Sequence, residues 1–256
     1  MDKSALKDFL DHKLSQYNQS SFIDNDPVQI PHMFKQQEDI EIAGFFAALF
    51  SWGQRKTILN KSHELLERMN MEPYTFVVNA DQGALNAFKY FKHRTFNETD
   101  IHYIVLSLQH IYRGNKNLGQ YFSNLFQQSN RNMAETLSVF KAEFFRHPHQ
   151  KRTEKHIGDP LKGSTAKRLN MFLRWMVRKD ESGVDFGLWR DILASELFLP
   201  LDVHSGRVAR KLDLLRREQN DWKAVEEVTR NLRQFDANDP VKYDYALFGT
   251  GVVEKF

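Results

Sequence analysis

Residues 199–209 have the sequence Leu199-Pro200-Leu201-Asp202-Val203-His204-Ser205-Gly206-Arg207-Val208-Ala209, and this stretch says most about the fold. Pro200 ends whatever element precedes it, and Asp202 has the side chain of a good N-cap. Apolar residues then recur at helical spacing, which predicts a helix over residues 203–215. One interpretation is that Asp202 only caps this helix.

A second informative stretch lies upstream, where residues 163–167 have the sequence Gly163-Ser164-Thr165-Ala166-Lys167. Either Ser164 or Thr165 is expected to cap a helix that runs through Arg178. The two stretches therefore place a carboxylate and an amine, Asp202 and Lys167, each at the beginning of a predicted helix.

The rest of the chain shows helical periodicity, and no alternating pattern exceeds about four residues. We expect helices over residues 3–17, 39–51, 57–69, 81–91, 99–113, 118–128 and 133–146, one through Ser195, and others beginning near residues 222 and 241. Residues 39–51 are so apolar that they predict a buried central helix. Residues 18–33 are expected to form an extended connector and residues 146–161 a basic loop. The predicted fold class is all-α, with most of the 21 Phe, 8 Tyr and 4 Trp in the core.

Composition excludes several classes of protein. The 256 residues suffice for one large core or two small ones, and no run of 18 apolar residues predicts a membrane span. The charged start of the chain lacks the apolar region of a signal peptide, so a cytoplasmic location is expected. The absence of cysteine excludes disulfides, thiolate zinc sites and cysteine nucleophiles. No phosphate-binding loop, dinucleotide fingerprint or nucleophile elbow is found.

Positive charge is concentrated in two segments, although the net charge is only +3. Residues 146–179 contain ten Lys or Arg and two acidic residues, a balance of +8. Residues 203–217 contain five and one, a balance of +4. Such segments attract phosphates and make binding salt-dependent, although a solvated basic face is the alternative interpretation.

Four segments, in order, resemble the helix-hairpin-helix DNA glycosylases, the superfamily of endonuclease III. Residues 202–208 resemble the segment that carries that family's catalytic aspartate, and residues 163–170 resemble its hairpin with the catalytic lysine. Residues 41–54, followed by Asn60-Lys61, resemble its early helix, and residues 243–249 its late helix. Within the superfamily the chain is most similar to a bacterial family of unknown function.

The resemblance implies a two-lobed helical fold with DNA in the cleft between the lobes. Residues 40–180 would form one lobe, and residues 1–39 with 181–256 the other. It also implies that Lys167 and Asp202 are catalytic. The residues it implies for DNA binding are Trp52, Gln54, Arg55, Gly163, Ser164, Arg168, His204 and Arg207.

The chain also departs from the family pattern. Thr165 stands where the family's hairpin has its second glycine. Whether this hairpin binds phosphate, and whether it does so with a monovalent cation, is therefore left open. Lys167 and Asp202 are 35 residues apart, farther than in typical members, a feature shared with archaeal 8-oxoguanine glycosylases. Without cysteine, the iron–sulfur cluster of endonuclease III is impossible.

The chemistry fits the two residue types. Cleaving an N-glycosidic bond builds positive charge on the sugar, which an ionised carboxylate stabilises. A lysine amine can attack the sugar carbon, displace the base and leave an imine, from which strand scission follows. We therefore expect a DNA glycosylase with associated lyase activity on damaged duplex DNA, with no cofactor or metal. A non-catalytic protein that binds DNA or structured RNA and a helical scaffold for protein partners are the alternatives.

Three further clusters have weaker patterns. His93, Arg94 and Phe96 combine a titratable ring, a guanidinium and an aromatic face, so they are candidates for lining a pocket, with a loop anchor as the alternative. His147-Pro148-His149 does not have a convincing metal spacing. Turns and caps suffice to explain Asp236, Asp239 and Asp244.

Overall fold

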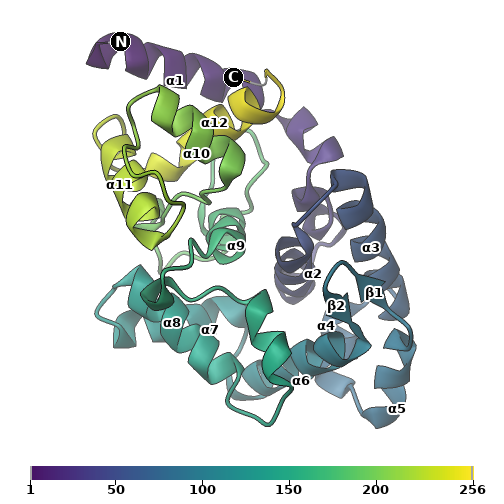
Figure 1. The fold of residues 1–256 in the computed structure, drawn as a ribbon. Helices are drawn as coiled ribbons and strands as arrows, with labels where there is room; N and C mark the ends of the chain where they lie inside the picture. Colours follow the sequence, from purple (N-terminus) through teal and green to yellow (C-terminus); the bar gives the residue numbers. More distant parts are fainter. Residues whose placement is uncertain (1, 255) are drawn as a thin grey trace.

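The computed structural model describes residues 2–254 and 256, and their fold is all-α, as predicted (Figure 1). The α-helices are α1 (Lys3–Tyr17), α2 (Gln37–Phe50), α3 (Arg55–Arg68), α4 (Pro73–Asn79), α5 (Gln82–Leu85), α6 (Glu98–Gly114), α7 (Leu118–Gln128), α8 (Met133–Phe144), α9 (Lys167–Val177), α10 (Val203–Lys211), α11 (Trp222–Leu232) and α12 (Tyr243–Val252). Strands β1 (Lys92–His93) and β2 (Phe96–Asn97) form an antiparallel pair in which His93 lies opposite Phe96. The 3₁₀ turns are Ser20–Asn25, Pro27–Gln29, Pro31–Met33, Asn86–Phe88, Lys151–His156, Pro160–Lys162, Ala194–Glu196 and Pro240–Lys242.

The helices gather in two groups around a central pair (Figure 1). Helices α1 and α10 both pack against α12 on one side, with α11 nearby, whereas α4 to α8 lie on the other. Helices α2 and α9 pack against each other between these groups. The division of the chain at residues 40 and 180 into two lobes stays a prediction.

Helix α2 is the centre of the core, as its apolar sequence predicts. Every residue from Ile40 to Phe50 is buried. Around it lie the stacked and edge-on rings of Phe122, Phe140, Phe144 and Phe172. Most of the aromatic residues are therefore core residues, as expected.

One charged residue of α2, Glu41, joins several elements. Its carboxylate accepts hydrogen bonds from Trp189 Nε1 at 2.7 Å, Tyr112 Oη at 2.9 Å and the backbone N–H of Leu118 at 2.8 Å. Burial raises the pKa of this carboxyl group, although these donors oppose the shift. Glu41 thus fixes α6, the first turn of α7 and the segment after α9 to the central helix.

Two connecting segments differ from the sequence prediction. Residues 18–33 form 3₁₀ turns rather than an extended connector, and Pro27 and Pro31 each begin a turn, where a missing N–H costs nothing. Where a helix through Ser195 is predicted, only the three-residue 3₁₀ turn Ala194–Glu196 forms. Instead, the N–H groups of Phe186 and Trp189 donate to the free carbonyls of Trp175 and Met176 at the end of α9.

Helices α4, α5 and α10 also differ from the prediction. The helix expected over residues 81–91 is only α5 and a 3₁₀ turn, and α4 was not predicted. Helix α10 ends at Lys211 rather than near Leu215, because the chain turns through a left-handed residue at Asp213, φ 57°. Among residues 2–254 and 256, no helix is long and apolar enough to cross a membrane.

Candidate active site

Lys167 is the first residue of α9, and the turn before it sets its position. Gly163 adopts a left-handed conformation with φ 83°, and so does Ala166 with φ 46°. Ala166 is the N-cap residue, and no side chain caps the helix. The predicted cap by Ser164 or Thr165 is therefore wrong, because the Ser164 hydroxyl accepts the Ala166 N–H at 3.1 Å within the turn.

Asp202 is the N-cap of α10, as predicted. Its Oδ1 accepts the N–H groups of His204 at 2.8 Å and Ser205 at 2.9 Å. The Ser205 hydroxyl in return accepts the Asp202 N–H at 3.0 Å. This capping box fixes one carboxylate oxygen and leaves Oδ2 to face another element.

The fold brings the predicted pair together. Lys167 Nζ lies 3.4 Å from Asp202 Oδ2, although the residues are 35 positions apart. The two side chains are 26% and 17% exposed, so both are shielded and yet accessible. The fold thus sets an amine, which is a potential nucleophile, beside a carboxylate oxygen that carries no backbone hydrogen bond.

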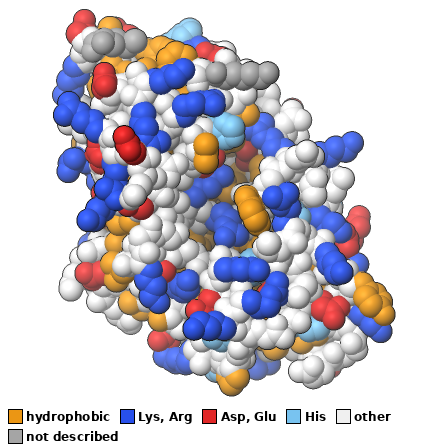
Figure 2. Space-filling view, viewed as in Figure 1, with side chains coloured by type: hydrophobic (Ala, Val, Ile, Leu, Met, Phe, Trp, Pro, Cys, Tyr) orange, Lys and Arg blue, Asp and Glu red, His pale blue; other side chains and the backbone are white. Residues whose placement is uncertain are grey.

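The pair lines a cavity of about 630 Å³, a size typical of ligand sites. Its walls come from residues 51–58, from α9, from the start of α10 and from α12. In the space-filling view, Lys and Arg side chains gather around a hollow near the centre of the face shown (Figure 2).

The floor of this cavity contains three charged residues that the sequence analysis did not assign to the site. Asp26, Arg174 and Asp244 line the cavity and are 7%, 3% and 6% exposed. Asp244 accepts a close hydrogen bond from Arg174 Nη1, so explaining it as part of a turn or cap is wrong. Asp236 and Asp239 do act as predicted, since both accept backbone N–H groups of the following turn.

Burial governs the ionisation of the two floor carboxyl groups. It raises the pKa of Asp244 to about 7, although Arg174 and Lys167 oppose the shift. Burial likewise raises the pKa of Asp26, against the charges of Arg174, Arg55 and Lys167. Perturbed carboxyl groups in a cavity are typical of functional sites.

Two arginines of the predicted basic segment are buried rather than exposed. Arg174 Nε lies 3.4 Å from Asp185, and Arg178 contacts Asp185 at 3.0 Å and Asp239 at 2.8 Å. Both guanidinium groups also lie over the Tyr245 ring. These two charges stabilise the interior, so the surface field of residues 146–179 is smaller than the sequence balance of +8 indicates.

Three predicted DNA-binding residues lie next to one another at the edge of the cavity. Trp52 is 51% exposed, and the Arg94 guanidinium lies 4.7 Å from its ring centroid. Gln54 is exposed, and the guanidinium of Arg55 lies 5.2 Å from the Phe248 ring. All three line the cavity, as does the exposed His204.

A second cavity of about 410 Å³ adjoins the first, and Trp52, Ser51 and Lys167 line both. Its other lining residues include Lys155, Arg168 and the hydroxyls of Ser164 and Thr165. Arg168 donates to the Leu49 carbonyl at 2.9 Å, and burial lowers its pKa to about 10. Gly163 lies in the turn beside this cavity.

The remaining predicted site residues lie elsewhere. Arg207 donates to the carbonyls of Gly251 and Phe256, both at 2.9 Å, and thereby ties α10 to the end of α12. His93 and Phe96 are buried, with His93 Nε2 2.9 Å from the Phe50 carbonyl and Phe96 stacked on His156. Together with Arg94 on Trp52, they have the contacts expected of a loop anchor and line neither cavity.

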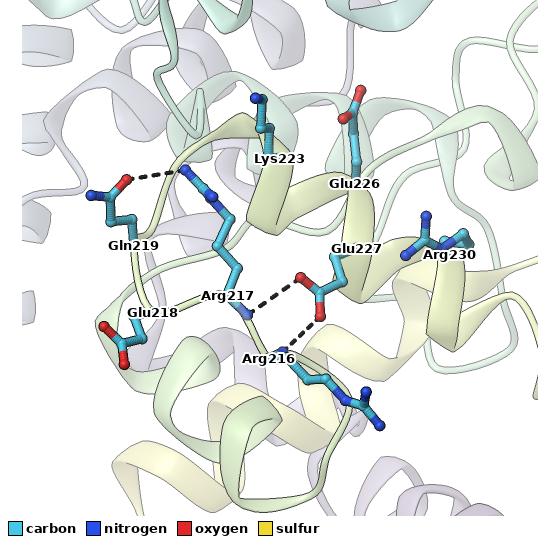
Figure 3. A pocket seen from close by; sticks show the side chains of 8 residues that line it. All are labelled: Arg216, Arg217, Glu218, Gln219, Lys223, Glu226, Glu227 and Arg230. Carbon is cyan, nitrogen blue, oxygen red and sulfur yellow. Dashed lines mark hydrogen bonds between the residues drawn. The ribbon is translucent and has the colours of Figure 1, made fainter.

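A third hollow, of about 710 Å³, lies along α11 and shares no lining residue with the cavity of the pair (Figure 3). The Glu227 carboxylate accepts the backbone N–H groups of Arg216 and Arg217, and Arg217 is paired with Asp221. Charges of both signs neutralise one another there, so it offers less chemistry than the Lys167 cavity. Among the described residues, no group of three or more His, Asp or Glu could hold a metal ion.

Residues 26–253 match the model of the family described as "Protein of unknown function (DUF2400)". The chain belongs to this family. Comparison with curated proteins and with solved structures finds no match.

The matched residues 26–253 include every charged residue that lines the cavity. Asp26 is the first residue of the match. One feature of the sequence could have revealed the buried charged residues of this cavity. Arg174 stands between Leu173 and Trp175 in an apolar helix, and a buried arginine requires a carboxylate partner. Nothing local indicated which of the many aspartates would provide it.

Proposed function

We propose that this protein is a nucleic-acid glycosylase that removes a damaged base, with Lys167 as nucleophile and Asp202 as its carboxylate partner. The observation that carries the proposal is the 3.4 Å contact between Lys167 Nζ and Asp202 Oδ2 inside a ligand-sized cavity. The resemblance of residues 163–170 and 202–208 to the glycosylase motifs implies the same two roles.

The chemistry is a substitution at the anomeric carbon of the sugar. The neutral amine forms a bond to this carbon while the bond to the base breaks, and the base leaves with the electron pair and takes up a proton. Asp202, while ionised, stabilises the positive charge that develops on the sugar. After the bond to carbon has formed, the attacking nitrogen carries a positive charge, and Asp202 accepts the proton that this nitrogen then loses. Opening of the sugar ring then gives an imine between Lys167 and the sugar, from which strand scission by elimination follows.

Reductive trapping tests the proposal. The protein is mixed with duplexes that carry an abasic site, 8-oxoguanine, uracil or an alkylated base, and borohydride is added to reduce any imine to a stable amine. We expect a protein–DNA band on a denaturing gel that Lys167→Gln abolishes. The matched control is Lys162→Gln, a highly exposed lysine in the same hairpin, which should keep the band.

The possible outcomes test the assignment of Lys167 separately from the proposed glycosylase activity. A band that survives Lys167→Gln would move the role to another lysine. No band on any duplex, with salt-sensitive DNA binding intact, would favour the second candidate, a non-catalytic nucleic-acid-binding protein. The second cavity supports this candidate, because Lys155, Lys167 and Arg168 line it without a carboxylate.

A further inference from the structure

We infer that His156, in the wall of the second cavity, is the base that removes a proton from the sugar in the elimination step after imine formation. This inference rests on the proposed function and adds a catalytic residue that the sequence analysis did not assign. The two cavities can serve one bound substrate, because Trp52 and Lys167 line both.

A carboxylate and an aromatic ring orient the His156 side chain. Its Nε2 lies 3.3 Å from Asp100 Oδ2, and the Phe96 ring stacks on it with the centroids 3.6 Å apart. Asp100 is itself held by the Asn97 N–H and the Thr153 hydroxyl. A carboxylate beside one ring nitrogen places the proton on that nitrogen, so the other nitrogen of the neutral ring has a free lone pair.

The nitrogen with the free lone pair is Nδ1 of His156. Within residues 2–254 and 256, no group forms a hydrogen bond with Nδ1, and this atom is not sealed from solvent as Nε2 is. The side chain is only 2% exposed, and yet it lines the second cavity. The structure thus leaves one proton-accepting atom, shielded from bulk water, at the wall of this cavity.

His156 and the proposed nucleophile lie close together. Arg168 Nη2 donates to the Lys155 carbonyl at 3.4 Å, so the residues next to Lys167 and His156 in the sequence are in contact. His156 and Lys167 also line the same cavity of about 410 Å³. A sugar joined to Lys167 in this cavity would lie within reach of Nδ1.

The elimination balances with His156 as the base. In the imine, Nδ1 takes a proton from the sugar carbon next to the carbon that is bonded to Lys167, and the ring becomes an imidazolium. The electron pair of that C–H bond forms a carbon–carbon double bond, while the bond from the following carbon to the phosphate oxygen breaks. The phosphate leaves with the electron pair of the broken bond. Lys155 and Arg168 line the cavity, and their charges stabilise the leaving phosphate.

The charges around His156 keep a base available at neutral pH. Burial lowers the pKa of His156, and the positive charges of Arg168 and Lys155 act in the same direction, whereas Asp100 opposes them. The ring is therefore neutral at pH 7. Asp202 and His156 then accept different protons, the first from nitrogen and the second from carbon.

A duplex with a preformed abasic site tests the inference, because it needs no base removal. Parallel samples under single-turnover conditions give the rate of strand scission and the amount of borohydride-trapped imine. His156→Gln keeps an amide donor for Asp100 but has no basic nitrogen. We expect it to trap imine within about twofold of the native protein and to cut the strand about 100-fold more slowly.

His93→Gln is the matched control for this variant. His93 is also 2% exposed and also stacks against Phe96, but it lines neither cavity. It should cut at the native rate, and thermal unfolding should show that both variants are folded. Scission by His156→Gln at the native rate, or an equal loss of scission and trapped imine, would overturn the inference. A native protein that neither traps nor cuts would refute the proposed function, and with it the step assigned to His156.

The pH dependence of the native protein gives a second test that needs no variant. The ratio of scission rate to trapped imine should fall as the pH decreases below 6.5, the ordinary pKa of histidine, because His156 becomes protonated. Protonation of Lys167 lowers both quantities and leaves their ratio unchanged. A ratio that does not change with pH would overturn the inference.

Discussion

The two carboxylate oxygens of Asp202 make two different contacts. Oδ1 caps α10, and Oδ2 faces Lys167 at 3.4 Å. The structural interpretation and the functional interpretation of this residue therefore do not compete. A mutation can separate the capping role from the proposed catalytic role. An asparagine side chain can cap the helix, but it cannot supply the negative charge that the proposed reaction requires.

Asp202→Asn should leave the fold nearly intact and abolish base release. Asparagine is as good an N-cap as aspartate, so we expect the free energy of unfolding to change by less than about 1 kcal/mol. Urea denaturation and a base-release assay measure the two effects. Ser205→Ala is the matched control, since it removes the hydroxyl that accepts the Asp202 N–H and keeps the carboxylate. It should lower stability and retain activity. The role of Asp202 is refuted if Asp202→Asn remains active.

The raised pKa of Asp244 predicts how stability depends on pH. The folded state holds this proton up to about pH 7, whereas the unfolded chain releases it near the ordinary pKa of 3.8. The contribution is therefore fully present below about pH 4 and is lost as the pH rises through 7. Asp244→Asn cannot titrate, so its stability relative to the native protein should improve between pH 5 and pH 8. Denaturant unfolding at several pH values tests this, and a pH-independent difference would contradict it.

At the scale of the element, Asp100 connects the start of α6 to the Lys151–His156 turn. Its carboxylate accepts the Asn97 N–H at 3.0 Å, Arg152 Nη1 at 2.7 Å and the Thr153 hydroxyl at 2.7 Å. Burial would raise its pKa, but the His156 ring, the Thr153 hydroxyl and the Asn97 N–H hold the pKa well below its usual range. The turn that it holds carries Lys155 and His156, which line the second cavity.

Asp100→Ala should destabilise the protein by about 3 kcal/mol, because it removes one partner of a buried charged network. The native contribution is present above about pH 4 and decreases as the pH falls further, since the folded pKa is depressed. Guanidinium denaturation at pH 7 measures the loss. Asp81→Ala, which removes the cap of the exposed four-residue helix α5, should cost about 1 kcal/mol or less. Equal losses for the two variants would refute the special role of Asp100.

The elements also show where sequence reasoning succeeds. The bounds of α1 and α7 and the buried character of α2 follow from local periodicity, and the Asp202 cap follows from residue type. The 3₁₀ turns before α2 and the loop through Ser195 do not follow from local sequence. Their conformation depends on contacts with helices that are distant in the sequence. The floor of the cavity was missed for the same reason, since Asp26 and Asp244 have roles only after α9 is in place.

At the scale of the whole molecule, only some of the positive charges in the basic segment lie on the surface. Arg174 and Arg178 are buried in ion pairs, whereas Lys162 is highly exposed. Only exposed cations release counterions when a nucleic acid binds.

For the proposed DNA binding, we expect Lys162→Gln to reduce the slope of log affinity against log salt by about 1. Arg178→Gln should leave this slope unchanged and lower stability instead, because its charge neutralises buried carboxylates. Fluorescence anisotropy over a range of salt concentrations, together with thermal unfolding, distinguishes the two. The prediction fails if both variants change the slope equally.

The cavity has a consequence for the order in which the protein forms. Its charged groups come from positions 26, 55, 167, 174, 202 and 244, so a growing chain contains all of them only when most of it has been synthesised. Closing such long loops is a late and slow event in folding. A nascent chain can therefore contain α2 or α9 and still lack the contact between Lys167 and Asp202. The encounter of this amine with this carboxylate is a marker of completed folding, so the proposed reaction would have to wait until nearly the whole chain is in place.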